Sequence, residues 1–403
     1  MLFFATTVNY IDRQVLSILK PTLMGELHWS ESDYGWIVFS FQCAYALMMP
    51  AAGRLIDKLG TRLGYALAVI VWSLASMAHS IAGTFRQFAL ARFGLGIGEA
   101  ANFPAAIKTV ADWFPKKERA LATGIFNSGA NVGAIAAPLL VQLVAVRLGW
   151  RAVFLVTGAL DMVWLAAWLF YFRRPGEHRS LSKAELSYIR CDGDEDASSR
   201  IHYSTLLGQR AAWAFVLGKF LTDPVWWFYL FWIPGFLNRT YGLTLSGLGP
   251  PLICIYVAAD AGSILGGWLS SALVARGWTL NAARKTAMLL CAVAVTPVIS
   301  LLFVHDLWPA VALISLAAAA HQGWSANLFT LVSDTFPQRA VGSVVGLGGL
   351  GGAVGGMLVA PAVGYWLDFS GGSYGPLFLC AGSAYLIAFG VIQGLVPRLD
   401  TST

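Results

Sequence analysis

The sequence predicts an all-α integral membrane protein whose twelve transmembrane helices form two pseudo-symmetric bundles of six. Three observations predict this fold class. Hydrophobic residues make up 57% of the 403 positions and charged residues only 12%, whereas soluble domains carry about 25% charged residues. Apolar runs recur at the ~20-residue length that a membrane-spanning helix requires. Finally, a short sequence pattern in the first half of the chain is repeated in the second half.

Twelve apolar segments have the length of a transmembrane helix, and tryptophans such as Trp29, Trp113 and Trp150 lie near their ends, as in the aromatic belts at membrane surfaces. Strands of a membrane barrel would be ~10 residues long with alternating polarity, which these segments are not. The first begins at Met1, without the basic region or cleavage site of a signal peptide. The predicted spans are residues 1–20, 34–57, 63–82, 85–111, 119–146, 151–172, 212–237, 248–274, 285–304, 308–333, 340–366 and 375–397.

A polar stretch, residues 173–211, separates the first six spans from the last six. It contains the charged run CDGDEDASSR and the sequence SKAE at Ser182–Glu185, which is a capping box and predicts a short helix from Lys183 to about Arg190. We therefore expect a six-helix bundle at 1–172, a cytoplasmic linker at 173–211, and a second six-helix bundle at 212–403.

The two predicted bundles share a repeated motif. DWFPKKERA at 112–120 resembles DTFPQRA at 334–340, because both carry Asp-x-Phe-Pro followed by Arg-Ala. Parallel repeats of six spans are typical of secondary transporters, which bind substrate near the membrane midplane and reach alternating access by rocking one half against the other.

Several function classes are excluded or disfavoured by what the sequence lacks. It has no Walker loop, so ATP does not drive it directly, and no nucleophile elbow or metal-ligand cluster that would support an enzyme. The five cysteines have no paired spacing, so we expect no disulfide, no metal site and no other cofactor.

The basic residues predict the orientation. Cytoplasmic loops of membrane proteins carry an excess of Lys and Arg. With the N-terminus inside, the outer loops hold only Lys20, Arg86, Arg147, Arg151 and Arg239. The inner loops hold Lys58, Arg62, Lys116, Lys117, Arg119, Arg276, Arg284, Lys285, Arg339 and Arg398, besides seven basic residues in the linker. We expect a monomeric, multi-pass protein of the inner (plasma) membrane with both termini cytoplasmic, the lipid bilayer around it and no nucleic-acid partner.

The loop after the second predicted span reads GRLIDKLGTR, from Gly53 to Arg62. It resembles the major facilitator superfamily signature G-x-L-x-D-[RK]-x-G-[RK]-[RK], with Thr61 at a position that is usually basic. The resemblance implies that this loop latches cytoplasmic helix ends in one state of a transport cycle. The matching positions are Gly53, Asp57, Lys58, Gly60 and Arg62.

Further stretches narrow the resemblance to the anion:cation symporter branch of that superfamily. They are NYIDR at 9–13, ARFGLGIGEAANFPAA at 91–106, ADWFPKKERALATGIFNSG at 111–129, KFLTDPVWWFYLFWIP at 219–234 and WSANLFTLVSDTFP at 324–337. The last two are similar to hexuronate transporters, which import galacturonate and glucuronate with protons.

Four ionisable residues lie well inside predicted spans: Asp12 and Arg13 in the first, Arg92 and Glu99 in the fourth. A charge at mid-bilayer costs at least ~2.5–3.5 kcal/mol, so such residues are usually functional. Arg92 and Glu99 are seven positions apart and share a helix face. The glycines between them, at 94, 96 and 98, permit close approach to a neighbouring helix. We expect all four side chains to meet; a purely structural ion pair is the alternative.

The resemblance assigns roles to these residues. It implies that Arg13 and Arg92 hold the substrate carboxylate and that Asp12 and Glu99 couple protons. It also matches Tyr45 in the second span to a tyrosine that contacts substrate, with ordinary aromatic packing as the alternative.

Other polar and aromatic side chains are candidates for contacts with a polyhydroxylated ligand. Asn127 and Asn131, four positions apart, share a helix face, and the tenth span carries a dense polar run. Aromatic residues that follow Pro224 could stack on a sugar ring. For all of these, hydrogen bonding or packing between helices is the structural alternative. The complete set is Asn127, Asn131, Trp226, Trp227, Tyr229, Gln322, Trp324, Ser325 and Asn327.

The roles of five more intramembrane residues stay open. Lys219 and Asp223 have the spacing of a neutralising pair within one helix. His321 is either a packed side chain or a proton carrier. Asp161 and Asp260 are isolated in the sequence, and Asp260 is the better functional candidate of the two.

These features predict a proton-coupled importer of an organic anion, most simply a hexuronate. Another carboxylate (an aldonate, a sulfonated acid or a small organic acid) would also suit two arginines. An exporter or antiporter of the same fold is a second alternative, but the fifth span reads NVGAIAAP and lacks the G-P-x-x-G-G that antiporters often carry there. A non-transporting sensor is the third, and the short linker offers no signalling domain.

The orientation is directly testable. A reporter fused after Asp196 should read as cytoplasmic, because the linker carries seven basic residues. A pair of reporters that are active only on opposite sides of the membrane measures this. An external reading would overturn the proposed orientation.

Overall fold

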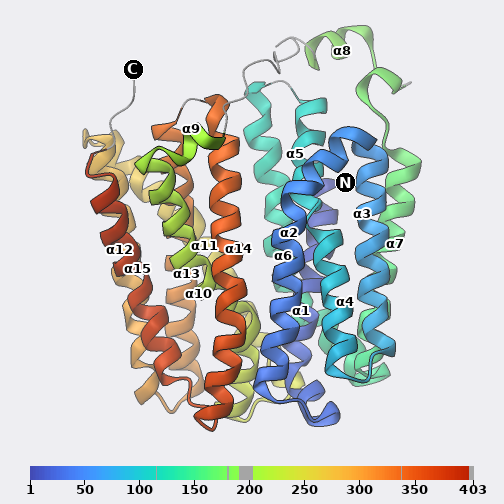
Figure 1. Ribbon diagram of the computed structural model, residues 1–403, viewed down its shortest axis with the longest axis vertical. Helices are drawn as coiled ribbons and strands as arrows, with labels where there is room; N and C mark the ends of the chain where they lie inside the picture. Colours follow the sequence, from blue (N-terminus) through green and yellow to red (C-terminus); the bar gives the residue numbers. More distant parts are fainter. Residues whose placement is uncertain (115, 179–180, 190–202, 337, 399–403) are drawn as a thin grey trace. The chain divides into compact units, whose positions relative to one another are not determined.

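The twelve predicted spans appear as long helical segments in the computed structural model, which describes residues 1–403 except 115, 179–180, 190–202, 337 and 399–403 (Figure 1). Every regular element among the described residues is a helix, and none is a strand. The segments are α1 (Leu2–Leu27), α2 (Glu31–Leu59), α3 (Thr61–Ala78), α4 (Phe85–Glu99) with α5 (Asn102–Trp113), α6 (Lys116–Leu148), α7 (Trp150–Tyr171), α10 (Arg210–Tyr241), α11 (Gly249–Ala275), α12 (Leu280–Val295), α13 (Leu307–Thr335), α14 (Gln338–Phe369) and α15 (Gly375–Leu395).

Seven stretches of described residues are long and apolar enough to cross a membrane by length and composition alone. Neither α1 nor α4, which carry the ionisable residues singled out above, is among them. The seven are Thr61–Ile81, Ile125–Leu148, Trp150–Tyr171, Leu245–Ala275, Leu280–Phe303, Ser343–Phe369 and Gly375–Leu395.

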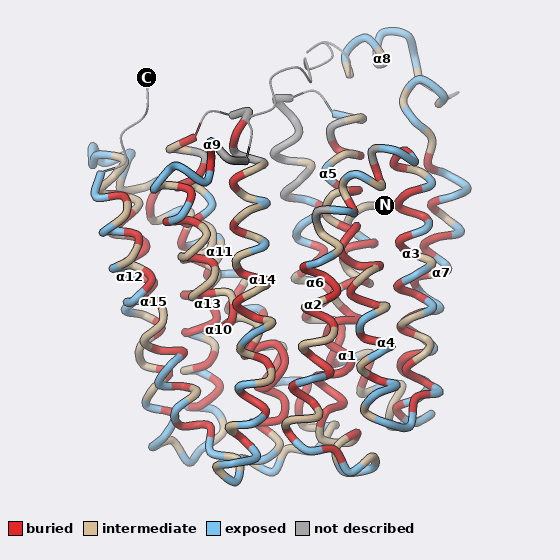
Figure 2. Tube along the Cα trace, viewed as in Figure 1, coloured by how far each residue is buried: buried red, intermediate tan, exposed pale blue. Residues whose placement is uncertain are grey.

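The chain divides into two compact units, the first made of Met1–Trp29 with Trp36–Ala197 and the second of Ser30–Gly35 with Ser198–Thr403. In the first unit, α1 packs on α6 and α7, and α3 packs on α4 and α7. In the second, α11 packs on α13, and α10 packs on α14 and α15. Buried positions recur along α1 and α4, whereas α8 (Lys183–Ile189) has no buried residue (Figure 2).

Two predicted spans are not continuous α-helices. The span predicted at 85–111 is broken: α4 ends at Glu99, and α5 begins at Asn102. The Ala101 N–H bonds to the Gly98 carbonyl, three residues back, and this tighter turn interrupts the α-helical pattern. The span predicted at 285–304 continues from α12 into a 3₁₀ helix, η5 (Thr296–Phe303). Pro297 lies at its start, where its missing N–H favours a change of helix type.

The linker contains short helical pieces. Helix α8 occupies the positions where the capping box predicted a helix, and the Ser182 hydroxyl accepts a hydrogen bond from the Glu185 N–H at 3.1 Å. A 3₁₀ turn, η2 (Pro175–Glu177), precedes α8, and α9 (Tyr203–Leu207) follows it. The acidic run at 191–200 lies outside the described residues.

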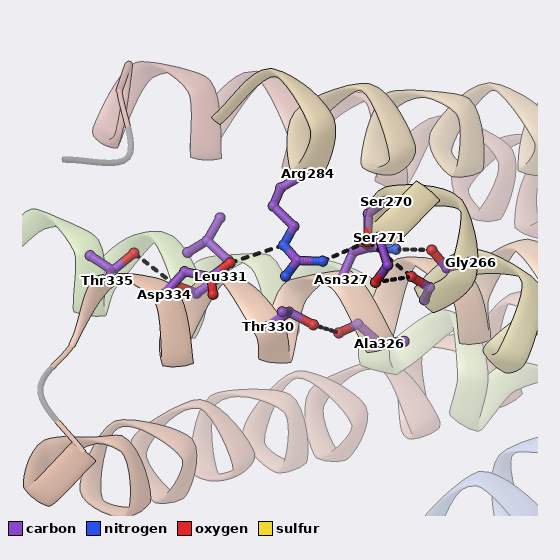
Figure 3. A network of polar contacts seen from close by, with 11 residues as sticks. Gly266, Ser270, Ser271, Arg284, Ala326, Asn327, Thr330, Leu331, Asp334 and Thr335 are labelled. Atoms are coloured by element: carbon purple, nitrogen blue, oxygen red, sulfur yellow. Dashed lines mark hydrogen bonds and ion pairs between the residues drawn. The ribbon is translucent and has the colours of Figure 1, made fainter. Parts of the chain in front are cut away.

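The repeated Asp-x-Phe-Pro motif has a similar structural role in both units. In the second unit, Arg284 of α12 donates to Asp334 at 2.9 Å and to the Ser270 hydroxyl at 2.7 Å, so that α11, α12 and α13 are tied together (Figure 3). In the first, Thr61 donates to Asp112 at 3.3 Å. Each motif aspartate therefore fixes the end of its helix to a neighbouring helix of the same unit.

Candidate functional site

A buried ion pair joins Arg13 of α1 to Glu99 of α4 in the first unit. The Arg13 Nε atom is 2.5 Å from Glu99 Oε2, and the side chains are 5% and 0% exposed. Removing one partner would leave an uncompensated buried charge, which typically costs 3–5 kcal/mol. This ion pair therefore connects α1 to α4. Without either residue, its partner would be an unpaired buried charge.

Aromatic rings from α1 and α2 surround the Arg13 guanidinium. Its central carbon lies 5.0 Å from the centroid of Tyr10, 4.9 Å from that of Tyr45 and 5.5 Å from that of Phe41. At these distances the rings attract the cation. Tyr45 thus contacts the same arginine that was predicted to bind a carboxylate.

Arg92 of α4 is directed at the same region of α1. It is 2% exposed, its Nη2 atom donates to the Arg13 backbone carbonyl at 3.5 Å, and its guanidinium carbon is 5.8 Å from the Phe41 centroid. Both arginines and Glu99 therefore converge on one segment of α1, where the sequence pattern placed them.

The glycines of α4 pack against α2 and α3, not against α1. A methyl group built at Gly98 would lie 2.6 Å from the Trp72 backbone nitrogen on α3, and one built at Gly94 would lie 3.3 Å from Ala75 on the same helix. A methyl group at Gly96 would meet the backbone of α2 at Phe41. Close packing of α4 on α2 and α3 thus sets the positions from which Arg92 and Glu99 reach α1.

Asp12 faces different helices from its neighbour Arg13. Its Oδ1 atom accepts a hydrogen bond from the Ser76 hydroxyl of α3 at 2.7 Å. Ser76 is in turn 3.1 Å from the Thr157 hydroxyl of α7. Because successive residues on a helix point about 100° apart, α1 presents a carboxylate to α3 and α7 and a guanidinium to α2 and α4.

The second unit holds its own polar cluster on α10, α13 and α15. Lys219 and Asp223, both on α10, form a 2.9 Å ion pair. His321 Nδ1 is 2.5 Å from the Tyr385 hydroxyl, and the Trp226 ring stacks on the imidazole at 4.9 Å between centroids and 4° between planes. One face of Trp226 is therefore already covered by His321.

The other aromatic candidates of the second unit are packed against protein. Trp227 stacks on Phe231 at 5.7 Å, and Trp324, which is fully buried, meets Tyr385 edge-on at 5.6 Å. Tyr229 is 3% exposed. Its hydroxyl has no hydrogen-bond partner among the described residues, and neither does the Trp324 indole nitrogen.

The polar run of α13 divides into two kinds of side chain. Asn327 is fully buried, and its amide nitrogen donates to the backbone carbonyls of Gly266 and Gly323, both at 2.9 Å (Figure 3). These bonds connect α13 to α11. Gln322 and Ser325 are only half-buried and are better placed to contact a ligand.

The two asparagines of α6 lie apart from the buried charges. Asn127 is exposed and Asn131 is half-exposed. The neighbouring Gly129 and Gly133 face α1, where they contact the backbone of Phe3 and Thr7. The asparagines, two positions away from these glycines, point away from α1.

The loop that resembles the superfamily signature forms the turn between α2 and α3. Gly60 has a φ of +76°, a left-handed conformation that favours glycine. Arg62 donates to the Leu169 carbonyl of α7 at 2.5 Å, Lys58 is exposed, and Gly53 is half-buried on α2. The side chain of Asp57 lies outside what the structure describes, so the latch role of this loop stays a prediction.

Comparison with known proteins shows the family. Residues 2–360 match the Major Facilitator Superfamily. The chain belongs to that superfamily. It is 34% identical to a hexuronate transporter of Escherichia coli (strain K12), over 97% of this chain and 90% of the relative. It is 35% identical to a galacturonate transporter of Dickeya chrysanthemi, over 66% of this chain and 78% of the relative.

The solved structures agree on the fold. A bacterial homologue of the human lysosomal transporter Spinster, in an inward-facing and unoccupied conformation, matches with a TM-score of 0.73 at 21% identity, over 98% of this chain and 94% of the other. This protein is therefore an integral membrane transporter of the major facilitator fold, not an enzyme, and its relatives indicate that it carries an organic acid.

Sequence reasoning missed several buried polar residues of the transporter's first bundle. Ser76 and Thr157 connect to Asp12 through hydrogen bonds. Asn9 is fully buried, one turn before Asp12 and Arg13. Asp161 was taken as an isolated charge, yet it contacts Asp12. A search for hydroxyl and amide groups inside spans would have found these residues but not their partners. Asp260, on α11, is only half-buried.

Two open pockets in the described part of the chain lie away from these residues. A cavity of about 570 Å³ in the first unit is lined by apolar side chains near the start of α1, including Leu2, Phe3, Trp113 and Phe126. A second, of about 150 Å³, lies in the second unit between Leu221 and Ala384. None of the residues predicted to bind substrate or protons lines either cavity.

The close packing of α4 on α3 can be tested with one methyl group. Gly98→Ala should destabilise the protein by about 1–3 kcal/mol, the usual cost of overpacking, because the added carbon would meet the Trp72 and Ala68 backbone within 3 Å. Gly390→Ala on α15 is the matched control, since nothing lies within 4 Å of its added carbon. It should be neutral or stabilising by up to about 1 kcal/mol. Thermal unfolding in detergent measures both, and equal midpoints would contradict the packing argument.

Proposed function

We propose that this transporter imports a hexuronate such as galacturonate or glucuronate, in symport with protons, by alternating access. We place it in the inner membrane, with both termini and the linker on the cytoplasmic side. The observation that carries this proposal is the buried Arg13–Glu99 pair with Arg92 beside it. Its support from comparison is the similarity to a hexuronate and a galacturonate transporter.

Arg13 is suited to exchange one carboxylate for another. The planar guanidinium fork fits a carboxylate bidentately, and the three surrounding rings provide an apolar wall that suits a sugar face. Glu99 is already bound to the guanidinium. A substrate carboxylate that binds Arg13 takes the place of Glu99.

The same exchange couples substrate to protons. Once it is separated from Arg13, Glu99 is a buried carboxylate without its cation, and the neutral acid is then its more stable form. Substrate binding thus favours uptake of a proton by Glu99, and loss of that proton favours the return of Glu99 to Arg13. In our proposal, the bundle changes its orientation across the membrane only after the proton is bound.

The sugar hydroxyls require further partners. We assign this role to Tyr45, Tyr229, Gln322 and Ser325, and, at the exposed face of α6, to Asn127 and Asn131. Trp226 and Trp227 remain candidates for stacking on the sugar ring. Trp324 and Asn327 support the site by packing and by fixing α13 to α11.

Other sugar acids are the main alternative substrates. The chain is 30% identical to a D-galactonate transporter of another Escherichia coli strain and 32% identical to a probable galactarate/D-glucarate transporter of Escherichia coli (strain K12). A thermal-shift panel of galacturonate, glucuronate, galactonate and glucarate on purified protein ranks them. A true substrate at a hundredfold excess over its dissociation constant stabilises the protein by ~2.7 kcal/mol.

The role of the second arginine is tested by truncation. Arg92→Ala should weaken galacturonate binding roughly ten- to a hundredfold, because a hydrogen bond to a charged group is worth ~1.5–3 kcal/mol. Arg92→Lys should rescue poorly. The matched control is Arg86→Ala, an exposed arginine of the same helix, which should bind normally. Calorimetric titration measures this, and wild-type affinity in Arg92→Ala would place the anion site elsewhere.

The coupling role of Glu99 is tested by separating binding from energy conversion. Glu99→Gln mimics the protonated acid, so the reconstituted variant should still exchange galacturonate in counterflow but fail to concentrate it when a pH gradient is imposed. The matched control is Glu26→Gln, which removes the acid of a half-exposed ion pair with Arg151. This control should show both counterflow and uphill uptake. Uphill uptake at the wild-type rate by Glu99→Gln would show that Glu99 is only a structural counter-ion.

A further inference from the structure

A pair of acids lies buried in the first unit, on a different face of α1 from Arg13. Asp161 of α7 is 0% exposed and Asp12 of α1 is 2% exposed, and their carboxyl groups are in hydrogen-bonding contact. Neither oxygen of Asp161, nor Oδ2 of Asp12, receives an ordinary hydrogen bond from any donor among the described residues. Two carboxyl groups thus contact each other, with the Thr157 hydroxyl beside Asp12 and the Trp72 indole beside Asp161.

The surroundings of the pair offer hydroxyl groups but no directly bound cation. Ser76 donates to Asp12 Oδ1 and contacts Thr157. The indole of Trp72 and the ring of Tyr65, both on α3, face Asp161. Two charged groups of α4 lie near the pair. Arg92 attracts Asp12 electrostatically, and Glu99 repels Asp161.

Repulsion between the two acids points the same way. The buried charged groups of the first unit include three cations, Arg13, Lys20 and Arg92, and three acids, Asp12, Asp161 and Glu99. Two ionised carboxylates in contact would repel each other in an apolar interior, which is strongly unfavourable. One bound proton removes this repulsion. Glu99 already has Arg13 at 2.5 Å, so the contact between Asp12 and Asp161 is where that proton is most stable.

We propose that Asp12 and Asp161 share one proton and form a proton-binding site separate from Glu99. The proton comes from water and forms an O–H bond to one carboxyl oxygen, while the other carboxylate accepts its hydrogen bond. Two like carboxylates held together retain a proton that either alone would lose more easily, and the pair titrates as a unit. Asp161 is then a proton-binding residue of the transporter. Its part in coupling rests on the proposed symport, but the shared proton itself does not.

The alternative is that Asp161 is an independent, permanently neutral acid that serves only packing. The two cases differ in additivity. If the proton is shared, Asp12→Asn and Asp161→Asn each remove it, because the new amide N–H stabilises the remaining carboxylate, and the double variant removes nothing more. If Asp161 is independent, its proton survives in Asp12→Asn.

Infrared spectroscopy of purified protein without substrate tests this, since a protonated carboxyl has its own C=O stretching band. At neutral pH we expect a band equivalent to one acid that is lost in Asp12→Asn, in Asp161→Asn and in the double variant. The band should persist in Glu99→Gln and in the exposed-site control Asp306→Asn. Survival of the band in Asp12→Asn, or its loss in Glu99→Gln alone, would overturn the proposal.

A milder variant keeps the test informative if either aspartate variant fails to fold. Ser76→Ala removes the hydroxyl that stabilises ionised Asp12, so the shared proton should be released at a higher pH than in the wild type. An unchanged release pH would count against the pair.

Transport assays then distinguish a failure of this proposal from a failure of the proposed symport. Asp161→Asn vesicles should retain galacturonate counterflow, and the pH profile of gradient-driven uptake should shift to lower pH. If no sugar acid is transported by the wild type, the symport proposal fails while the infrared result stands. If uptake is normal and its pH profile is unmoved in Asp161→Asn, the shared proton has no part in coupling.

Discussion

The need to neutralise charge in an apolar interior governs the first bundle of this transporter. Arg13 cannot reach water at 5% side-chain exposure, so a carboxylate must come to it, and Glu99 does so from α4. That requirement fixes how α4 is packed: Gly96 and Gly98 bring its backbone against α2 and α3, and only from that position does its last residue meet α1. The helix then breaks immediately after Glu99.

The adjacent charges of α1 have separate partners for the same reason. Because neighbouring residues on a helix point in different directions, Arg13 faces α2 and α4, whereas Asp12 faces α3 and α7. In our proposal, α1 thus carries the anion-binding Arg13 on one face and Asp12, one member of the acid pair, on another. A displacement of α1 by substrate at Arg13 would then alter the surroundings of Asp12, because both residues belong to the same helix.

The sequence predicted the spans well because helices are the main way to satisfy the backbone inside lipid, and apolar length reveals them. It also predicted that Arg13, Glu99 and Arg92 would meet, since charges in spans must find each other. It placed Asp12 in the same group, whereas Asp12 bonds to Ser76 of α3. It did not predict the break after Glu99, because a local tightening of the turn leaves no apolar gap. Nor did it pair Asp161 with Asp12. Periodicity tells which residues share a helix face, but the helix that packs against that face depends on the whole bundle.

The two bundles differ in where their ion pairs lie, and this difference has a mechanical consequence. Lys219 and Asp223 neutralise each other within α10, so competition for Lys219 by a ligand would not break an ion pair between helices. It would disturb the contact between helices that the Lys219 ammonium makes with the Phe329 ring of α13, whose centroid is 4.7 Å away. Arg13 and Glu99 connect α1 to α4, so a carboxylate that displaces Glu99 removes an interaction between two helices and frees an acid in the same step. Only an ion pair of this second kind converts the binding of an anion into both a change of helix packing and the uptake of a proton. For this reason we propose that anion binding and proton coupling lie in the first unit.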